Sequence, residues 1–154
     1  MRILGIIPAR GGSKGIPRKN LSDLGGRPLI EWSIDSGCQL LQKGVLSRCI
    51  VSTDDKEIAA VACSHGADVP FLRPIAAATD TSKSITYVTH ALDTLKPQDG
   101  TYDAVMILQP TSPLRDPDAI SNAIKLFDTC NADSMISCYQ EDYINEHVMY
   151  KQSS

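Results

Sequence analysis

The sequence predicts an α/β domain in which an open, mostly parallel sheet is flanked by helices. Short apolar runs with the length of β-strands alternate along the chain with stretches of helical periodicity, which is typical of parallel α/β folds. The run at residues 104–108 is apolar throughout, as expected of a strand that is covered on both faces. The 154-residue chain shows no internal repeat or linker, so we expect residues 1–154 to form one domain.

The expected strands are the short apolar runs at residues 3–7, 49–51, 69–71, 104–108 and 135–138. The expected helices follow Pro28, follow Asp54, include the stripe from Ile85 to Leu95, and follow Asp116.

Two of these helices have recognisable start signals. Asp54 stands three residues before Glu57, a spacing that predicts a capping box. Asp116 and Pro117 have the residue types preferred at the N-cap and first position of a helix.

The polar segments follow predicted strands, at residues 8–20, 52–55, 73–84 and 109–115. Because the loops after parallel strands gather at one edge of an open sheet, we expect these four segments to converge on one binding site.

The first of these segments is a glycine-rich loop, residues 8–20, which reads PARGGSKGIPRKN. The first twenty residues hold five Lys and Arg and no Asp or Glu, whereas the rest of the chain has ten basic and eighteen acidic residues. Glycines let backbone N–H groups approach an anion, and the basic side chains neutralise it. The loop is not a Walker A motif, because Gly15 is followed by Ile16, and it lacks the dinucleotide fingerprint. We therefore expect a small polyanion, most simply a triphosphate.

The composition argues against several other functions. A sequence pI of about 5.5 gives no basic field for nucleic acid. No apolar stretch approaches the ~20 residues of a membrane span, and the N-terminus lacks a signal-peptide pattern, so we expect a cytoplasmic protein. None of the five cysteines forms a C-x-x-C pair, so we expect buried, reduced cysteines and no zinc site.

Four motifs carry a resemblance to a known family. They are IPARGGSKGIPRKN at residues 7–20, IVSTDD at 50–55, LRP at 72–74 with Asp80 and Thr81, and LQPTSPLR at 108–115. In this order they resemble the acylneuraminate cytidylyltransferase (CMP-N-acetylneuraminic acid synthetase) family, and its sialic-acid-type branch in particular. The resemblance covers nearly the whole chain and implies a Rossmann-like nucleotidyltransferase fold of the GT-A type.

The resemblance also assigns roles to residues. It implies a catalytic role for Arg10, Lys14 and Lys19 at the CTP phosphates. It implies substrate-binding roles for Ala9, Ser13, Asn20, Arg73, Ser82, Ser84, Gln109, Thr111, Ser112 and Arg115. In the stretch after Arg73, relatives often carry an acidic residue where this chain has residues 75–78, IAAA.

The implied reaction joins CTP to a nine-carbon 2-keto sugar acid, giving a CMP-sugar and pyrophosphate, with Mg²⁺ as cofactor. Family members continue past the point where this chain stops. We therefore expect the C-terminal part of the family fold to be missing, with residues 143–154 beginning a dimerisation arm of a homodimer. Because the late acidic motif that holds Mg²⁺ belongs to that part, the metal ligands stay unassigned.

Three alternatives stay open. The chain could be a CTP-binding module without catalysis, or a different sugar nucleotidyltransferase that uses UTP or GTP. A phosphate-transferring kinase ranks last, because there is no Walker A motif. The identity of the sugar acid among N-acetylneuraminate, legionaminate and pseudaminate is also open.

Overall fold

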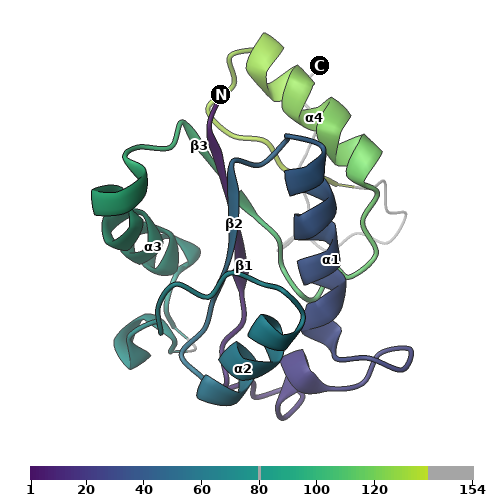
Figure 1. Cartoon of the computed structure of the whole chain (residues 1–154), viewed down its shortest axis with the longest axis vertical. Helices are drawn as coiled ribbons and strands as arrows, with labels where there is room; N and C mark the ends of the chain where they lie inside the picture. The colour runs from purple at the N-terminus through teal and green to yellow at the C-terminus, as the bar shows by residue number, and fades with distance from the viewer. Residues whose placement is uncertain (80, 139–154) are drawn as a thin grey trace, which may run out of the picture.

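A computed structural model describes residues 1–79 and 81–138 and has a parallel sheet at its centre (Figure 1). The strands, in the spatial order β2-β1-β3, are β1 (Ile3–Pro8), β2 (Arg48–Ser52) and β3 (Ala104–Ile107). Both strand pairs are parallel. The predicted α/β class and parallel sheet are confirmed.

Helices cover both faces of this sheet. They are α1 (Leu29–Gln42), α2 (Lys56–Ser64), α3 (Ser84–Asp99) and α4 (Pro117–Thr129), with short 3₁₀ helices η1 (Lys19–Leu21) and η2 (Ile75–Ala77). Figure 1 shows α3 on one side of the sheet and α1 with α4 on the other. Within the described residues, no helix is both long and apolar enough to cross a membrane.

The central strand β1 is buried on both faces, because alternate side chains point to opposite sides of a strand. On one face, Ile7 packs in a cluster with Ile34 of α1 and Ile58 of α2. On the other face, Ile6 packs in a cluster with Leu95 of α3. Each fully buried side chain of this size contributes about 1.5–3 kcal/mol to folding. These two layers hold the carboxyl end of β1, where the glycine-rich loop begins.

Several sequence predictions are wrong in detail. Residues 69–71 form no strand, and the flanking residues make only isolated bridges, Asp68 to Ile50 of β2 and Leu72 to Thr53 just after β2. The reason is Pro70, which has no N–H to donate to a ladder. Residues 135–138 form no strand either, because they make no ladder with a described strand.

Side-chain burial adds two details. Ile85, the first residue of the predicted stripe, is 63% exposed, whereas Leu95 at its other end is buried, as are Tyr87 and Ala91 of the same helix. All five cysteines are free thiols, as expected, but only Cys49 is buried, while the others are exposed or partly exposed.

The predicted start of α4 is confirmed. Asp116 is its N-cap, with the side chain accepting a hydrogen bond of 2.8 Å from the Asp118 N–H, and Pro117 is the first helical residue.

Strand β3 has β1 as its one neighbour among the described strands, so its outer edge is open. Ile107 is 38% exposed there. An apolar groove of about 670 Å³ lies along this edge, lined by β3, by one side of α4 and by residues 135–137.

Helix α1 approaches β2 closely at Gly37. A Cβ atom at Gly37 would lie 2.6 Å from the Sγ atom of the buried Cys49. Because the Cys49 side chain or the helix must shift to admit the added methyl group, Gly37→Ala is expected to lower the free energy of unfolding by about 1–3 kcal/mol. Urea unfolding of the purified chain measures this.

The matched control is Cys49→Ala, which removes the sulfur atom. In the Cys49→Ala background, Gly37→Ala is expected to lower the free energy of unfolding by less than it does in the parent. Equal effects of Gly37→Ala in the two backgrounds would contradict the assigned contact.

Candidate functional site

A cavity of about 290 Å³ opens at the carboxyl ends of the strands. The glycine-rich loop, the segment after Arg73 and the turn after β3 all contribute to its wall. Its lining residues are Pro8, Arg10, Ser13, Lys19, Asn20, Arg73, Ala77, Ala78, Thr79, Ser82, Tyr87, Gln109, Pro110 and Thr111. Three of the four polar segments that the sequence predicted to converge therefore meet in this cavity, and residues 52–55 lie behind the loop.

Eight of the thirteen residues singled out from the sequence line the cavity. Five others do not: Ala9, Lys14, Ser84, Ser112 and Arg115. Ala9 is fully buried, and its N–H donates a 3.0 Å hydrogen bond to the Ser52 carbonyl.

Lys14 and Ser84 are exposed outside the cavity, and Ser112 and Arg115 line the groove beside β3. Arg115 fastens the turn after β3 to α1. Its guanidinium donates to the Ser33 hydroxyl at 3.0 Å and to the carbonyl of Gln109. Burial lowers the pKa of Arg115. The side chain thus holds the backbone of Gln109, a cavity residue, without lining the cavity itself.

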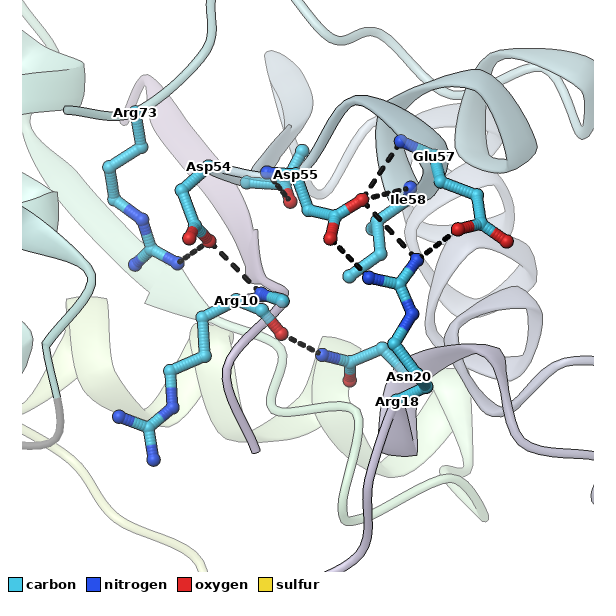
Figure 2. Close-up of polar contacts among 10 residues, drawn as sticks. Arg10, Arg18, Asn20, Asp54, Asp55, Glu57, Ile58 and Arg73 are labelled. Atoms are coloured by element: carbon cyan, nitrogen blue, oxygen red, sulfur yellow. Dashed lines mark hydrogen bonds and ion pairs between the residues drawn. The ribbon is translucent and has the colours of Figure 1, made fainter. Parts of the chain in front are cut away.

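The glycine-rich loop is held by polar contacts at three points (Figure 2). The Gly11 N–H donates to Asp54 Oδ1 at 3.0 Å. The buried Asn20 closes the loop, because its Nδ2 donates to the Arg10 carbonyl at 3.0 Å. Arg18 forms ion pairs with Asp55 and Glu57 at the start of α2.

Asp55 joins the loop to helix α2. Its Oδ1 accepts the N–H groups of Glu57 at 2.8 Å and Ile58 at 3.1 Å, so Asp55 caps the helix. The predicted cap Asp54 is wrong by one residue, because the chain leaves β2 with Asp54 turned to the loop and Asp55 turned to the helix. Burial raises the pKa of Asp55, but the hydrogen bonds from Arg18 and from the two backbone N–H groups outweigh it and lower the pKa overall.

Gly11 must be glycine for steric reasons. A Cβ atom there would lie 2.5 Å from Asp55 Oδ2 and 2.9 Å from Asp55 Cβ. Arg18 has a left-handed backbone (φ 53°), which is uncommon outside glycine, and its ion pairs with α2 hold it there.

Arg73 is the buried cation of the site. It is 5% exposed, and its Nε and Nη2 atoms are buried without a hydrogen-bond partner among the described residues. Its guanidinium lies over the Tyr87 ring at 5.4 Å, and Nη2 is 3.9 Å from Asp54 Oδ1. Burial lowers the pKa of Arg73, and the Asp54 charge opposes that shift. Because unpaired buried donors are costly, this arrangement favours a ligand that brings acceptor oxygens.

Tyr87 is a cavity residue that the sequence prediction missed. It is buried on the inner face of α3, and its hydroxyl has no hydrogen-bond partner among the described residues. The spacing of Tyr87, Ala91 and Leu95 by four residues is a helical stripe that identifies this face.

Comparison with known proteins places the chain in a family. The family model described as Cytidylyltransferase matches residues 4–153. The chain belongs to the cytidylyltransferase family. The resemblance seen in the sequence motifs is therefore confirmed, and with it membership of a nucleotidyltransferase family.

Three curated relatives illustrate the similarity. The chain is 46% identical over 126 residues to a CMP-N,N'-diacetyllegionaminic acid synthase from Legionella pneumophila, covering 82% of this chain and 53% of the relative. It is 37% identical over 150 residues to a pseudaminic acid cytidylyltransferase from Campylobacter jejuni, with 97% and 63% covered. It is 41% identical over 128 residues to an N-acylneuraminate cytidylyltransferase from Escherichia coli, with 83% and 29% covered.

The fold also matches a solved structure. A structure of CMP:2-keto-3-deoxy-manno-octonic acid synthetase complexed with CTP superimposes with a TM-score of 0.68 at 20% identity, covering 86% of this chain and 49% of that one. This match shows the Rossmann-like fold expected from the sequence. The chain spans less than two thirds of the length of these relatives.

Among the described residues, no group of three or more His, Cys, Asp or Glu side chains gathers as a candidate metal site. The two carboxylates nearest the glycine-rich loop are already engaged, Asp54 with Gly11 and Asp55 with Arg18 and the start of α2. A metal site is therefore not assigned to this part of the chain.

Removal of the Asp55 side chain tests the link between loop and helix. Asp55→Ala is expected to lower the free energy of unfolding by about 1–2 kcal/mol near neutral pH, because it removes a helix cap and the partner of Arg18. Since folding lowers the pKa of Asp55, this stabilisation is complete above the ordinary pKa of about 3.9 and is lost as the pH falls through the lowered value. The parent and the variant, compared by urea unfolding, should therefore converge in acid.

The matched control is Asp116→Ala, which removes the equivalent cap of α4 at a residue that does not line the cavity. Asp116→Ala should lower the free energy of unfolding by a similar amount through loss of a helix cap, and it should leave ligand binding unchanged. A difference between parent and Asp55→Ala that stays constant from neutral to acidic pH would contradict the assignment.

Proposed function

We propose that this chain forms the CTP-binding part of a cytidylyltransferase that converts a nine-carbon 2-keto sugar acid into its CMP derivative. The observation that carries the proposal is the cavity beside the glycine-rich loop, in which a buried arginine presents donors that have no partner among the described residues. The three relatives, whose names specify legionaminic, pseudaminic and N-acylneuraminic acids, support the sugar class.

The electrostatics of the cavity suit a triphosphate. Arg10, Lys19 and Arg73 line it, and the described lining residues include no Asp or Glu. Ser13, Asn20, Ser82 and Thr111 add neutral hydrogen-bonding groups. A wall with three cations favours a ligand with several negative charges and neutralises charge that develops on the departing pyrophosphate.

The proposed reaction is nucleotidyl transfer. The anomeric hydroxyl oxygen of the sugar acid forms a bond to the α-phosphorus of CTP, and the bond from that phosphorus to the bridging oxygen breaks. Pyrophosphate leaves, and the hydroxyl proton passes to solvent. Such chemistry depends on positioning and charge neutralisation, and Arg10 and Lys19 supply both at the loop.

The two ends of the cavity suggest where each substrate lies. Arg73, Ser82 and Tyr87 form one wall, which we assign to the cytidine, and Gln109 with Thr111 forms the wall at the end of β3, which we assign to the sugar acid. Lys14, Ser84 and Ser112 stand outside this wall, so their predicted contacts require a rearrangement on binding. Mg²⁺ and a homodimer stay predictions of the resemblance, and a cytoplasmic location stays a prediction from the sequence pattern.

A CTP-binding module without catalysis is the second candidate. The observation that favours it is the lack of a carboxylate cluster for a metal among the described residues. Release of pyrophosphate when this chain is mixed with CTP, Mg²⁺ and a sialic-type acid separates the enzyme from the module.

Nucleotide selectivity tests the proposal directly. Calorimetric titration of the chain with CTP, UTP, GTP and ATP, each with Mg²⁺, is expected to show selective binding of CTP. Lys19→Met is expected to weaken CTP binding roughly tenfold to a hundredfold, because it removes a charge-assisted hydrogen-bond donor while keeping the length of the side chain.

The matched control is Lys43→Met, which removes a lysine paired with Asp118 outside the cavity. It should bind CTP as the parent does. Equal affinity for all four nucleotides, or equal binding by Lys19→Met and the parent, would contradict the proposed site.

A further inference from the structure

Asp54 lies between the glycine-rich loop and the buried arginine of the site (Figure 2). Its Oδ1 accepts the Gly11 N–H at 3.0 Å, and the same oxygen is 3.9 Å from Arg73 Nη2. The side chain is only 18% exposed. Neither helix capping nor the proposed reaction uses this carboxylate.

The contact with Gly11 determines where the loop leaves the sheet. Gly11 follows Arg10, a lining residue of the cavity, and the Arg10 carbonyl is held in turn by Asn20. A hydrogen bond to an ionised carboxylate is about twice as strong as a neutral one. Asp54 therefore anchors the segment that carries the Arg10 side chain.

The contact with Arg73 is of a different kind. At 3.9 Å it is an ion pair and too long for a hydrogen bond, so the carboxylate attracts the guanidinium without using up its donors. Nε and Nη2 of Arg73 have no hydrogen-bond partner in the part of the chain that the structure describes. The backbone supports the same placement, because the Arg73 N–H donates to the Thr53 carbonyl at 2.7 Å, one residue before Asp54.

We propose that Asp54 is a positioning residue that holds the glycine-rich loop and Arg73 in one arrangement for the polyanionic substrate. The identity of that substrate as CTP rests on the proposed function, whereas the two contacts of Asp54 do not. The carboxylate touches neither phosphate nor sugar in this role and acts through the groups that it holds.

If Asp54 acted only through its charge, the expected effect of its removal on anion binding would be the opposite of that expected from positioning. Asp54 is negative and stands behind a cavity for anions, so its removal should strengthen anion binding if only charge matters. Positioning predicts that loss of the Gly11 contact weakens binding. Two variants that lose the same charge but differ in this contact therefore separate the effects.

Asp54→Asn and Asp54→Ala are such a pair. The asparagine keeps an amide oxygen that can accept the Gly11 N–H, and the alanine has none. In calorimetric titrations with inorganic pyrophosphate, Asp54→Ala is expected to bind roughly tenfold or more weakly than Asp54→Asn. An alanine variant that binds as tightly as the asparagine variant, or more tightly, overturns the proposal.

A second measurement needs no ligand. Amide hydrogen exchange at Gly11, followed by NMR, is expected to be at least about tenfold faster in Asp54→Ala than in Asp54→Asn. Asp118→Ala, which removes an exposed carboxylate paired with Lys43, serves as control and should leave this rate unchanged. Equal Gly11 rates in the two Asp54 variants overturn the proposal. If Asp54→Ala does not fold, Asp54→Ser replaces it in both measurements, because the serine hydroxyl is on a shorter side chain than the Asp54 carboxylate.

The two proposals can fail separately. If the parent chain binds pyrophosphate but does not prefer CTP, the proposed function is wrong, and the comparison of the Asp54 variants still decides the role of Asp54. If the parent prefers CTP but the variants bind pyrophosphate alike, only the role of Asp54 is wrong.

Discussion

Two consecutive carboxylates at the end of β2 organise the site. Asp54 accepts the Gly11 N–H, and Asp55 accepts two N–H groups of α2 while it pairs with Arg18. Backbone N–H groups and arginine side chains in the loop cannot hydrogen-bond to one another, since all of them are donors. The acidic pair supplies the acceptors that hold a cationic loop together before any anion arrives. Because β2 is part of the buried sheet, the two carboxylates that follow it, and the loop that they hold, have fixed positions relative to the sheet.

The sequence predicted the layers of the fold well. The strand within residues 104–108 and the helix capped by Asp116 are determined by residues close together in the sequence, so they could be identified without knowing their neighbours in space. It failed where a neighbour decides the outcome. Pro70 prevents a ladder beside β2, so the apolar run around it forms only bridges. Residues 135–138 are apolar enough for a strand, but a strand requires a hydrogen-bonded partner, and these residues form no ladder with a described strand.

The sequence motifs predicted which loops meet at the candidate site. Arg10, Lys19 and Arg73 meet in one cavity, as the convergence of loops after parallel strands requires. The sequence could not tell Asp54 from Asp55 as the helix cap, because the two are adjacent and identical and only the path of the chain separates them. It also could not show that Arg115 turns toward Ser33 and away from the cavity, since that contact spans distant parts of the chain.

The close approach of Gly11 to Asp55 has a consequence for how this chain can vary. A side chain at position 11 needs a smaller residue at position 55, but a smaller residue there gives up the cap of α2 and the ion pair with Arg18. Neither position can therefore drift on its own. In a collection of natural variants with this loop, the two positions should behave as one inherited unit, retained together or replaced together with a redesigned start of α2.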